Sequence, residues 1–119
     1  MRFEDMEIWQ RSARLSAELY EGFSDSRDFG FKGQTTRSGL SIPSNIAEGS
    51  ERGSKKDFIR FLQYSKGSCG ELRTQVYIGM KIHYISSDQG NKWLQEAREL
   101  SAMLTGFINS LKNQLITGD

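Results

Sequence analysis

The apolar residues of this 119-residue chain recur at three- and four-residue steps in four segments, which is the period of an α-helix. A strand would need alternating apolar and polar residues, and no stretch of useful length has that pattern. We predict helices over residues 6–21, 31–47, 55–85 and 89–116. Amphipathic helices with short connections favour an antiparallel arrangement. The sequence therefore predicts an all-α, up-down-up-down four-helix bundle, formed as a single domain by residues 1–119.

Capping residues and glycines indicate where the helices should begin and end. Asp5 is expected to cap the first helix, Ser54 the third and Asp88 the fourth, because short polar side chains favour these positions. Ser54 is followed three residues later by Asp57, in the manner of a capping box. Gly49 is expected to end the second helix.

The second segment contains the only proline of the chain, Pro43. Proline lacks the backbone N–H and crowds the carbonyl four residues back, which here belongs to Gly39. The apolar period continues through Pro43, so we expect one kinked helix rather than two helices. Gly39 is expected to ease the bend because it has no side chain.

Composition excludes several classes of protein. Sixteen basic and fifteen acidic side chains give a net charge of +1, so the overall charge indicates no particular partner. The single cysteine, Cys69, cannot form an internal disulfide, which excludes a disulfide-stapled secreted domain. No apolar run exceeds three residues, which excludes a membrane-spanning helix. A cytoplasmic location without membrane contact is the expectation.

The chain offers few residues for catalysis. His83, the only histidine, falls on the apolar side of the third segment and is expected to pack in the core. One histidine and one cysteine cannot supply a zinc site of the usual ligand spacing. Cys69 and His83 would lie about 21 Å apart along one helix, too far for activation of the thiol. We expect no catalytic residue, no metal, no cofactor and no enzymatic activity.

A polar stripe runs along one edge of the second predicted helix. Its members fall within roughly 80° of one another on a helical wheel, and they are Gln34, Arg37, Ser41, Asn45 and Glu48. One interpretation is a binding strip that presents an amide, a guanidinium, a hydroxyl and a carboxylate in a line. The other is a polar seam between packed helices or subunits, in which Arg37 and Glu48 neutralise each other or charges on other helices. Both interpretations stay open.

Two glycines, Gly67 and Gly70, lie inside the third predicted helix, where each costs about 1 kcal/mol relative to alanine. Close approach of another backbone is the expected reason, with small residues of the second helix as the partner surface. Ser68 and Glu71 lie beside these glycines. Glu71 is expected to reach a basic residue such as Arg37 or an amide such as Asn45.

Charge is distributed unevenly, with −3 over residues 1–30 and +4 over residues 52–73. The basic residues of the third helix are expected to face outward, together with Ile59. A basic stripe with interleaved tyrosines suits phosphate contacts and base stacking. The candidate nucleic-acid-binding residues are Lys55, Lys56, Arg60, Lys66, Arg73 and Tyr77. A subunit interface and an ordinary solvated face are the alternatives.

Three motifs give the chain a family resemblance. They are the tripeptide Ile-Trp-Gln at residues 8–10, the run Ser-Ile-Pro-Ser-Asn-Ile-Ala-Glu-Gly at residues 41–49, and Gly67-Ser68 with Glu71. On these residues the chain resembles the four-helix-bundle family of 23S rRNA intervening sequence proteins, also called S23 ribosomal proteins. The resemblance covers nearly the whole chain.

The resemblance implies a small bacterial bundle that forms a homo-oligomer, with a pentamer as the expected state. Some relatives are strongly basic accessory proteins that bind nucleic acid and a reverse transcriptase, whereas this chain carries a net charge of only +1. We therefore expect a non-enzymatic oligomeric protein that binds RNA or DNA through its basic face. The alternative is a scaffold or adaptor that binds another protein, through the polar stripe or through the surface between Ile59 and Tyr77.

Overall fold

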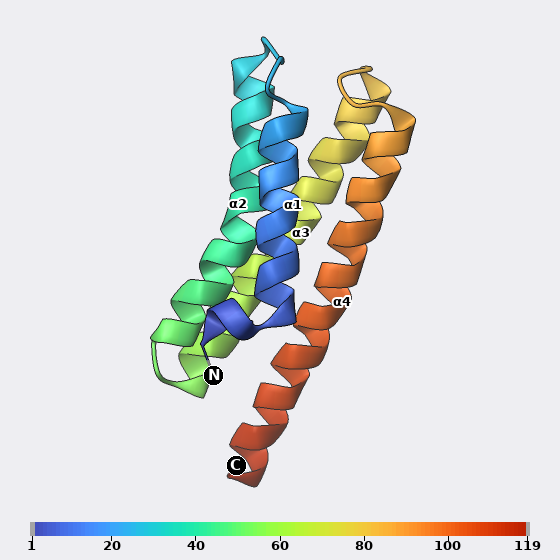
Figure 1. The fold of residues 1–119 in the computed structure, drawn as a ribbon. Coiled ribbons are helices and arrows are strands. Elements are labelled where there is room, and N and C mark those ends of the chain that lie inside the picture. The colour runs from blue at the N-terminus through green and yellow to red at the C-terminus, as the bar shows by residue number, and fades with distance from the viewer. Residues whose placement is uncertain (1, 119) are drawn as a thin grey trace.

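The computed structural model describes residues 2–118, and this range contains helices but no strand. A short 3-10 helix, η1 (Phe3–Asp5), precedes four α-helices, which are α1 (Glu7–Gly22), α2 (Phe29–Glu51), α3 (Lys55–Lys81) and α4 (Ser87–Thr117). Figure 1 shows each helix running in the direction opposite to the helix before it. The prediction of an all-α four-helix fold is confirmed.

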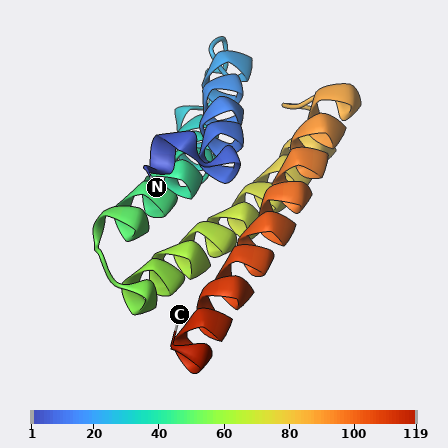
Figure 2. The same ribbon diagram turned by 60° about the horizontal axis from the view of Figure 1, so that its bottom comes forward.

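Helices that follow one another in the chain also pack against one another. The most extensive contact joins α2 and α3, whereas α1 and α4 touch only sparsely. The molecule is elongated, with extents of 50 × 21 × 20 Å. Figure 2 shows the long α3–α4 pair extending past the shorter α1. The last turns of α4 therefore leave the bundle, and Leu115 in these turns is 41% exposed.

The core lies along the bundle axis and is built from apolar residues at helical steps on all four helices. Its largest fully buried side chains are Leu15, Leu19, Ile42, Ile46, Leu62, Cys69, Leu72, Val76, Leu94, Leu100 and Leu104, with Thr35 among them. Tyr20 follows Leu19 at the margin of the apolar side of α1 and is 43% exposed. The helical period thus located most of the core but not the residues at the margins of each stripe.

Three of the four α-helices begin at a capping side chain. Asp28 precedes α2, Ser54 precedes α3 and Ser86 precedes α4, and each side-chain oxygen accepts a hydrogen bond from the backbone N–H three residues later. The prediction for Ser54 is confirmed. The predictions for Asp5 and Asp88 are wrong, because α1 begins without a side-chain cap and Asp88 already lies within α4.

Helix α2 is longer than the predicted segment of residues 31–47. Gly49, the expected end, is buried inside the helix, where an added Cβ would come within 2.8 Å of Phe61 Cβ. The chain turns instead at Gly53, whose φ of +83° suits glycine. Gly49 therefore serves close packing of α2 against α3, and Gly53 separates the two helices.

Helix α2 runs through Pro43 as a single helix, and a kink at that position stays a prediction. Gly39, four residues earlier, packs against α1. A Cβ at Gly39 would overlap Leu19 Cδ1 and lie 3.9 Å from Ser16 Cα. The missing side chain therefore allows α1 and α2 to approach closely.

Helix α3 ends at Lys81, earlier than the predicted residue 85, because His83 adopts a left-handed conformation with a φ of +66°. The N–H groups of His83 and Tyr84 donate to the carbonyls three and five residues back, at 3.2 and 2.8 Å. These two bonds form a Schellman C-cap, in which glycine usually takes the left-handed position. Histidine takes it here, so no glycine marks the helix end in the sequence.

Candidate functional site

The polar stripe predicted on α2 does not form one continuous site. The Asn45 side-chain amide donates to the Ser41 carbonyl at 2.8 Å, and the Glu48 carboxylate pairs with Arg52 at 2.9 Å. The side chains of Asn45 and Glu48 therefore find their partners within or next to their own helix, α2. The predicted neutralisation of Arg37 by Glu48 is wrong, because Glu48 is paired one turn further along α2.

The middle of the stripe packs against α3. The Ser41 and Ser68 hydroxyl oxygens lie 2.5 Å apart, and the Ser65 hydroxyl donates to the Ile42 carbonyl at 2.8 Å. Serine side chains are short, so hydroxyl bonds of this kind require the two helices to approach closely. These contacts favour the interpretation of Ser41 and Ser68 as part of a polar seam between packed helices.

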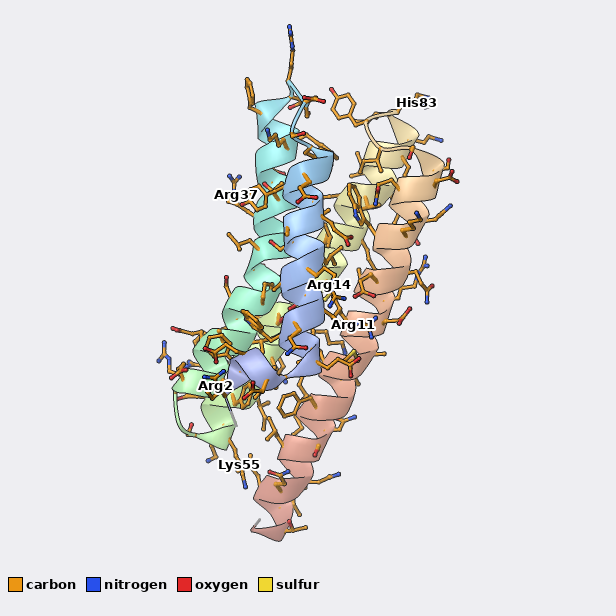
Figure 3. All side chains as sticks on the ribbon, in the orientation of Figure 1. Arg2, Arg11, Arg14, Arg37, Lys55 and His83 are labelled. Carbon is orange, nitrogen blue, oxygen red and sulfur yellow. The ribbon has the colours of Figure 1, made fainter. Side chains whose placement is uncertain are left out.

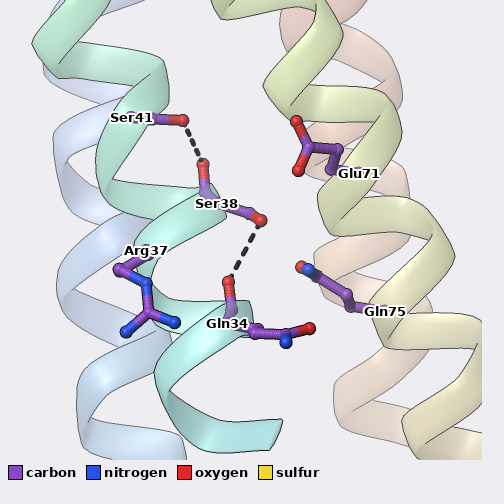
Figure 4. A pocket seen from close by; sticks show the side chains of 6 residues that line it. All are labelled: Gln34, Arg37, Ser38, Ser41, Glu71 and Gln75. Carbon is purple, nitrogen blue, oxygen red and sulfur yellow. Dashed lines mark hydrogen bonds between the residues drawn. The ribbon is translucent and has the colours of Figure 1, made fainter. Parts of the chain in front are cut away.

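A polar cavity of about 230 Å³ opens between α2 and α3, next to this seam. Its lining consists of Gln34, Arg37, Ser38, Ser41, Glu71 and Gln75. Figure 4 shows Glu71 and Gln75 pointing from α3 toward Gln34 and Ser38, with Arg37 on α2. The predicted contact of Glu71 with Arg37 or Asn45 is not found among the described residues. Glu71 and Arg37 both line this cavity, but no ion pair joins them in the described part of the chain.

The close approach expected at Gly67 and Gly70 does not occur within the chain. An added Cβ at Gly67 would meet nothing within 4 Å, and at Gly70 only the Arg73 guanidinium at 3.9 Å. Ser65 and Ser68 make the close contact with α2 instead. Gly67 lies about 200° around the helix from Ser65, so it faces outward.

The predicted nucleic-acid-binding residues lie on two sides of α3 rather than on one face. Successive residues turn by about 100°, which places Lys66, Arg73 and Tyr77 on one side of α3 and Lys56 and Arg60 on another. Lys55 lines a hollow beside the end of α2. The Arg60 guanidinium is partly neutralised by Asp57, at 3.1 Å. Figure 3 shows Lys55 at the end of the bundle opposite His83, far from the C-terminal half of α3.

Tyr77 is the centre of a basic surface formed jointly by α3 and α4. Arg98 Nη2 donates to the Tyr77 hydroxyl at 2.6 Å, and the Tyr77 side chain is 51% exposed. Arg73 is half-buried and donates to the Cys69 carbonyl at 3.4 Å. Within residues 2–118, none of the cations Lys66, Arg73 and Arg98 pairs with a carboxylate. We name Lys66, Arg73, Tyr77 and Arg98 the α3–α4 basic face.

Arg98 was missed by the sequence reasoning, which followed charge along residues 52–73. It comes from α4, and only the pairing of α3 with α4 brings it to Tyr77. Ile59, expected to face outward beside Tyr77, is 8% exposed and belongs to the core. That expectation is wrong because α4 covers this edge of α3.

The two residues considered for nucleophilic chemistry lie in different environments. His83 is exposed, because the chain turns outward at the end of α3, so the prediction of a core histidine is wrong. Cys69 is fully buried, and burial raises the pKa of its thiol to about 12. The thiol is therefore protonated at neutral pH, and a protonated thiol is a poor nucleophile.

A salt-bridge network that the sequence analysis did not predict joins α1 to α4. Arg11 Nη2 contacts Glu96 Oε1 at 2.5 Å and Glu99 Oε1 at 2.8 Å, and Arg11 Nε contacts Glu96 Oε2 at 3.0 Å. The hydrogen bond from Arg11 is the main cause that lowers the pKa of the Glu99 carboxyl. Figure 3 shows Arg11 on the side of α1 that faces α4. Because α1 and α4 touch sparsely elsewhere, this bridge has a structural role.

Residues 2–118 contain no group of three or more His, Cys, Asp and Glu side chains that could hold a metal ion. None of the helices in that range combines the length and the apolar character needed to cross a bilayer.

These features define an all-α four-helix protein with a polar cavity on one edge of α3 and a basic face on another. The chain belongs to the 23S rRNA-intervening sequence protein family, whose model matches residues 4–106. The predicted family is thereby confirmed.

A solved structure from Bacteroides thetaiotaomicron, described as a protein with unknown function from the S23 ribosomal protein family, is similar to this chain. The TM-score is 0.80 and the sequence identity 23%, over 85% of this chain and 97% of the other. At that identity the likeness shows a shared fold. None of the curated proteins matches the chain in sequence.

Proposed function

We propose that the chain is a non-enzymatic, self-associating protein that binds RNA or DNA on the α3–α4 basic face. The observation that carries this proposal is the 2.6 Å hydrogen bond from Arg98 to the Tyr77 hydroxyl. It holds a half-exposed aromatic ring beside a cation that pairs with no carboxylate among residues 2–118. Nucleic-acid bases stack on tyrosine rings, and Lys and Arg side chains contact the phosphates on either side. Tyr77 would stack a base, and Lys66, Arg73 and Arg98 would contact phosphates.

The net charge of +1 does not argue against this proposal, because the charge that matters is local. The acidic side chains nearest in sequence to Arg98 are Glu96 and Glu99, and both are engaged by Arg11. The positive charge of the α3–α4 basic face is thus left without a partner of its own. Phosphate is the ligand that such a surface favours.

Self-association is the second part of the proposal, with five copies as the number that the family resemblance implies. It is supported by apolar side chains that the single chain leaves exposed, namely Ile78 at 48%, Ile82 at 45% and Ile116 at 83%. Repetition of a weak phosphate site in one assembly raises the overall affinity without any new contact. Light scattering at several protein concentrations tests this part, and a monomer at all of them would refute it.

Salt dependence tests the nucleic-acid part directly. Fluorescence anisotropy would follow labelled single-stranded RNA, an RNA hairpin and DNA of the same sequence. Three phosphate contacts per chain on a single strand predict a slope of about −2 in a plot of log affinity against log salt. Affinity would then fall roughly twentyfold on a fourfold increase in salt. Binding that ignores salt would contradict a phosphate-based site.

Matched variants localise the binding to the proposed face. Tyr77→Ala should weaken binding by at least about fivefold, because stacking of one base contributes about 1 to 3 kcal/mol. Tyr77→Phe keeps the ring and should retain most of the affinity. Arg98→Gln should weaken binding, whereas Arg14→Gln removes an equal charge from exposed α1 and should not. Equal losses in the Arg98 and Arg14 variants would show that only overall charge matters.

A protein scaffold is the second candidate, and one observation favours it. An apolar groove of about 340 Å³ runs between α1 and α2. Its larger apolar side chains are Phe3, Trp9, Leu40 and Pro43, and Leu40 is 45% exposed. An oligomer that binds neither RNA nor DNA at low salt would move the assignment to this function. The affinity for a protein partner that covers this apolar groove should then change little with salt concentration.

A further inference from the structure

The polar cavity between α2 and α3 contains side chains that the fold leaves without partners. The Gln75 Oε1 atom is buried and accepts no hydrogen bond from residues 2–118. Glu71 and Arg37, which have opposite charges and line the same cavity, are paired neither with each other nor with another described residue. A buried acceptor without a donor costs free energy, so this arrangement favours a ligand that supplies one.

The hydroxyl groups of the cavity present acceptors rather than donors. Ser38 donates its hydrogen to the Gln34 carbonyl at 3.1 Å. The Ser41 hydroxyl has the Ser38 carbonyl at 2.9 Å and the Ser68 hydroxyl oxygen at 2.5 Å, so its single hydrogen is also used within the protein. What remains toward the cavity is oxygen lone pairs. Together with the Glu71 carboxylate and Gln75 Oε1, they form a wall that attracts a positively charged donor.

The cation Arg37 also lines the cavity, and Figure 4 shows its side chain extending from α2 on the side away from Glu71 and Gln75. An added Cβ at Gly33 would lie 3.0 Å from Arg37 Nη1, so the guanidinium lies along the surface of α2 above that glycine. The exposed Glu71 carboxylate therefore lines the α3 side of the cavity, and the exposed Arg37 guanidinium lines its α2 side. The two charges do not close into an ion pair, which leaves space for a molecule between them.

We propose that this cavity binds a small zwitterion, that is, a molecule with an ammonium group at one end and a carboxylate at the other. The ammonium group donates to Glu71 and to Gln75 Oε1, and the carboxylate accepts from Arg37. A volume of about 230 Å³ is several times that of one water molecule in the liquid, which is about 30 Å³. This proposal does not depend on nucleic-acid binding, because the α3–α4 basic face lies on a different edge of α3.

A series of unbranched ω-amino acids tests the proposal and measures the separation of the two charges. The probes are glycine, β-alanine, 4-aminobutyrate and 5-aminopentanoate, titrated into the full-length protein and followed by NMR. The side-chain amide signals of Gln34 and Gln75 should shift, and one chain length should bind best. Butylamine and butyrate, which carry one charge each, should bind roughly tenfold more weakly than the best member.

Charge-neutral variants show whether Glu71 and Arg37 supply the two contacts. Glu71→Gln and Arg37→Gln should each weaken the best probe by roughly tenfold, the loss expected for one charge-assisted hydrogen bond. Glu51→Gln and Arg14→Gln are matched controls on exposed helical positions outside the cavity and should leave affinity unchanged. Circular dichroism would confirm that all four variants are folded.

Two results would overturn the proposal. The first is that no member of the series shifts the Gln34 and Gln75 signals at any concentration. The second is that the Glu71→Gln and Arg37→Gln variants bind the best probe as strongly as the unsubstituted protein does. In either case the cavity would be a hydrated part of the helix seam.

Discussion

Alanine substitution at Gly39 and at Gly67 should change the free energy of unfolding in opposite directions, although both glycines lie inside helices. Alanine favours a helix over glycine by about 1 kcal/mol in an exposed position. Gly67 meets that condition, because an added Cβ would have nothing within 4 Å. Gly67→Ala should therefore raise the free energy of unfolding by about 1 kcal/mol.

At Gly39 the same gain in helix propensity is outweighed by a steric cost. The new Cβ would overlap Leu19 Cδ1, and Leu19 is fully buried, so its side chain has no open space into which to move. Ser16 Cα would lie 3.9 Å from the new Cβ, an ordinary van der Waals contact, so the steric cost comes from Leu19. Overpacking of a core costs about 1 to 3 kcal/mol. The overlap at Leu19 is severe, so we take the upper value of this cost, about 3 kcal/mol. The gain of about 1 kcal/mol in helix propensity offsets part of it. Gly39→Ala should therefore lower the free energy of unfolding by about 2 kcal/mol.

Urea denaturation followed by far-UV circular dichroism measures both changes, with light scattering of each variant to confirm an unchanged mass. A Gly39→Ala variant as stable as the parent would refute the close approach of α1 and α2 at this position. A less stable Gly67→Ala variant of unchanged mass would refute the assignment of Gly67 to open surface. A less stable variant with a lower mass would instead place Gly67 in contact with another copy of the chain.

Three further predictions concern the Arg11 bridge and the buried thiol. Arg11→Met should lower the free energy of unfolding by about 1 to 2 kcal/mol in urea denaturation, because Glu96 and Glu99 lose their shared donor; no change would show that the bridge is dispensable. The folded-state pKa of Glu99 is lowered from its ordinary 4.5, so the stability it contributes is present above that pH and lost as the pH falls through the folded-state pKa. Arg11→Met should therefore reduce the loss of thermal stability on acidification below about pH 4.5, and parallel pH profiles would refute this. Cys69, with a thiol pKa of about 12, should react with a thiol reagent only in denaturant, and rapid labelling of the native protein would contradict its burial.

The sequence by itself determined the number of helices, most of their core residues and the family. A helix forms from hydrogen bonds between residues four apart, so its presence and its apolar side can be read from local spacing. The Ser54 cap was predictable for the same reason, since it bonds a residue three positions away. The helix ends near Gly53 and His83 were not predictable from the sequence. A glycine can also serve close packing, as Gly49 does, and a histidine does not indicate a left-handed turn.

The tertiary structure alone decided which polar side chains share a surface. Arg98 meets Tyr77, and Glu71 shares a cavity with Arg37, through the rotation and register of packed helices. Rotation and register follow from the packing of the whole core, including the close approach at Gly39, and no local spacing specifies them. Arg98 therefore joins the basic residues of α3 only in the fold, because no local spacing relates a residue of α4 to one of α3.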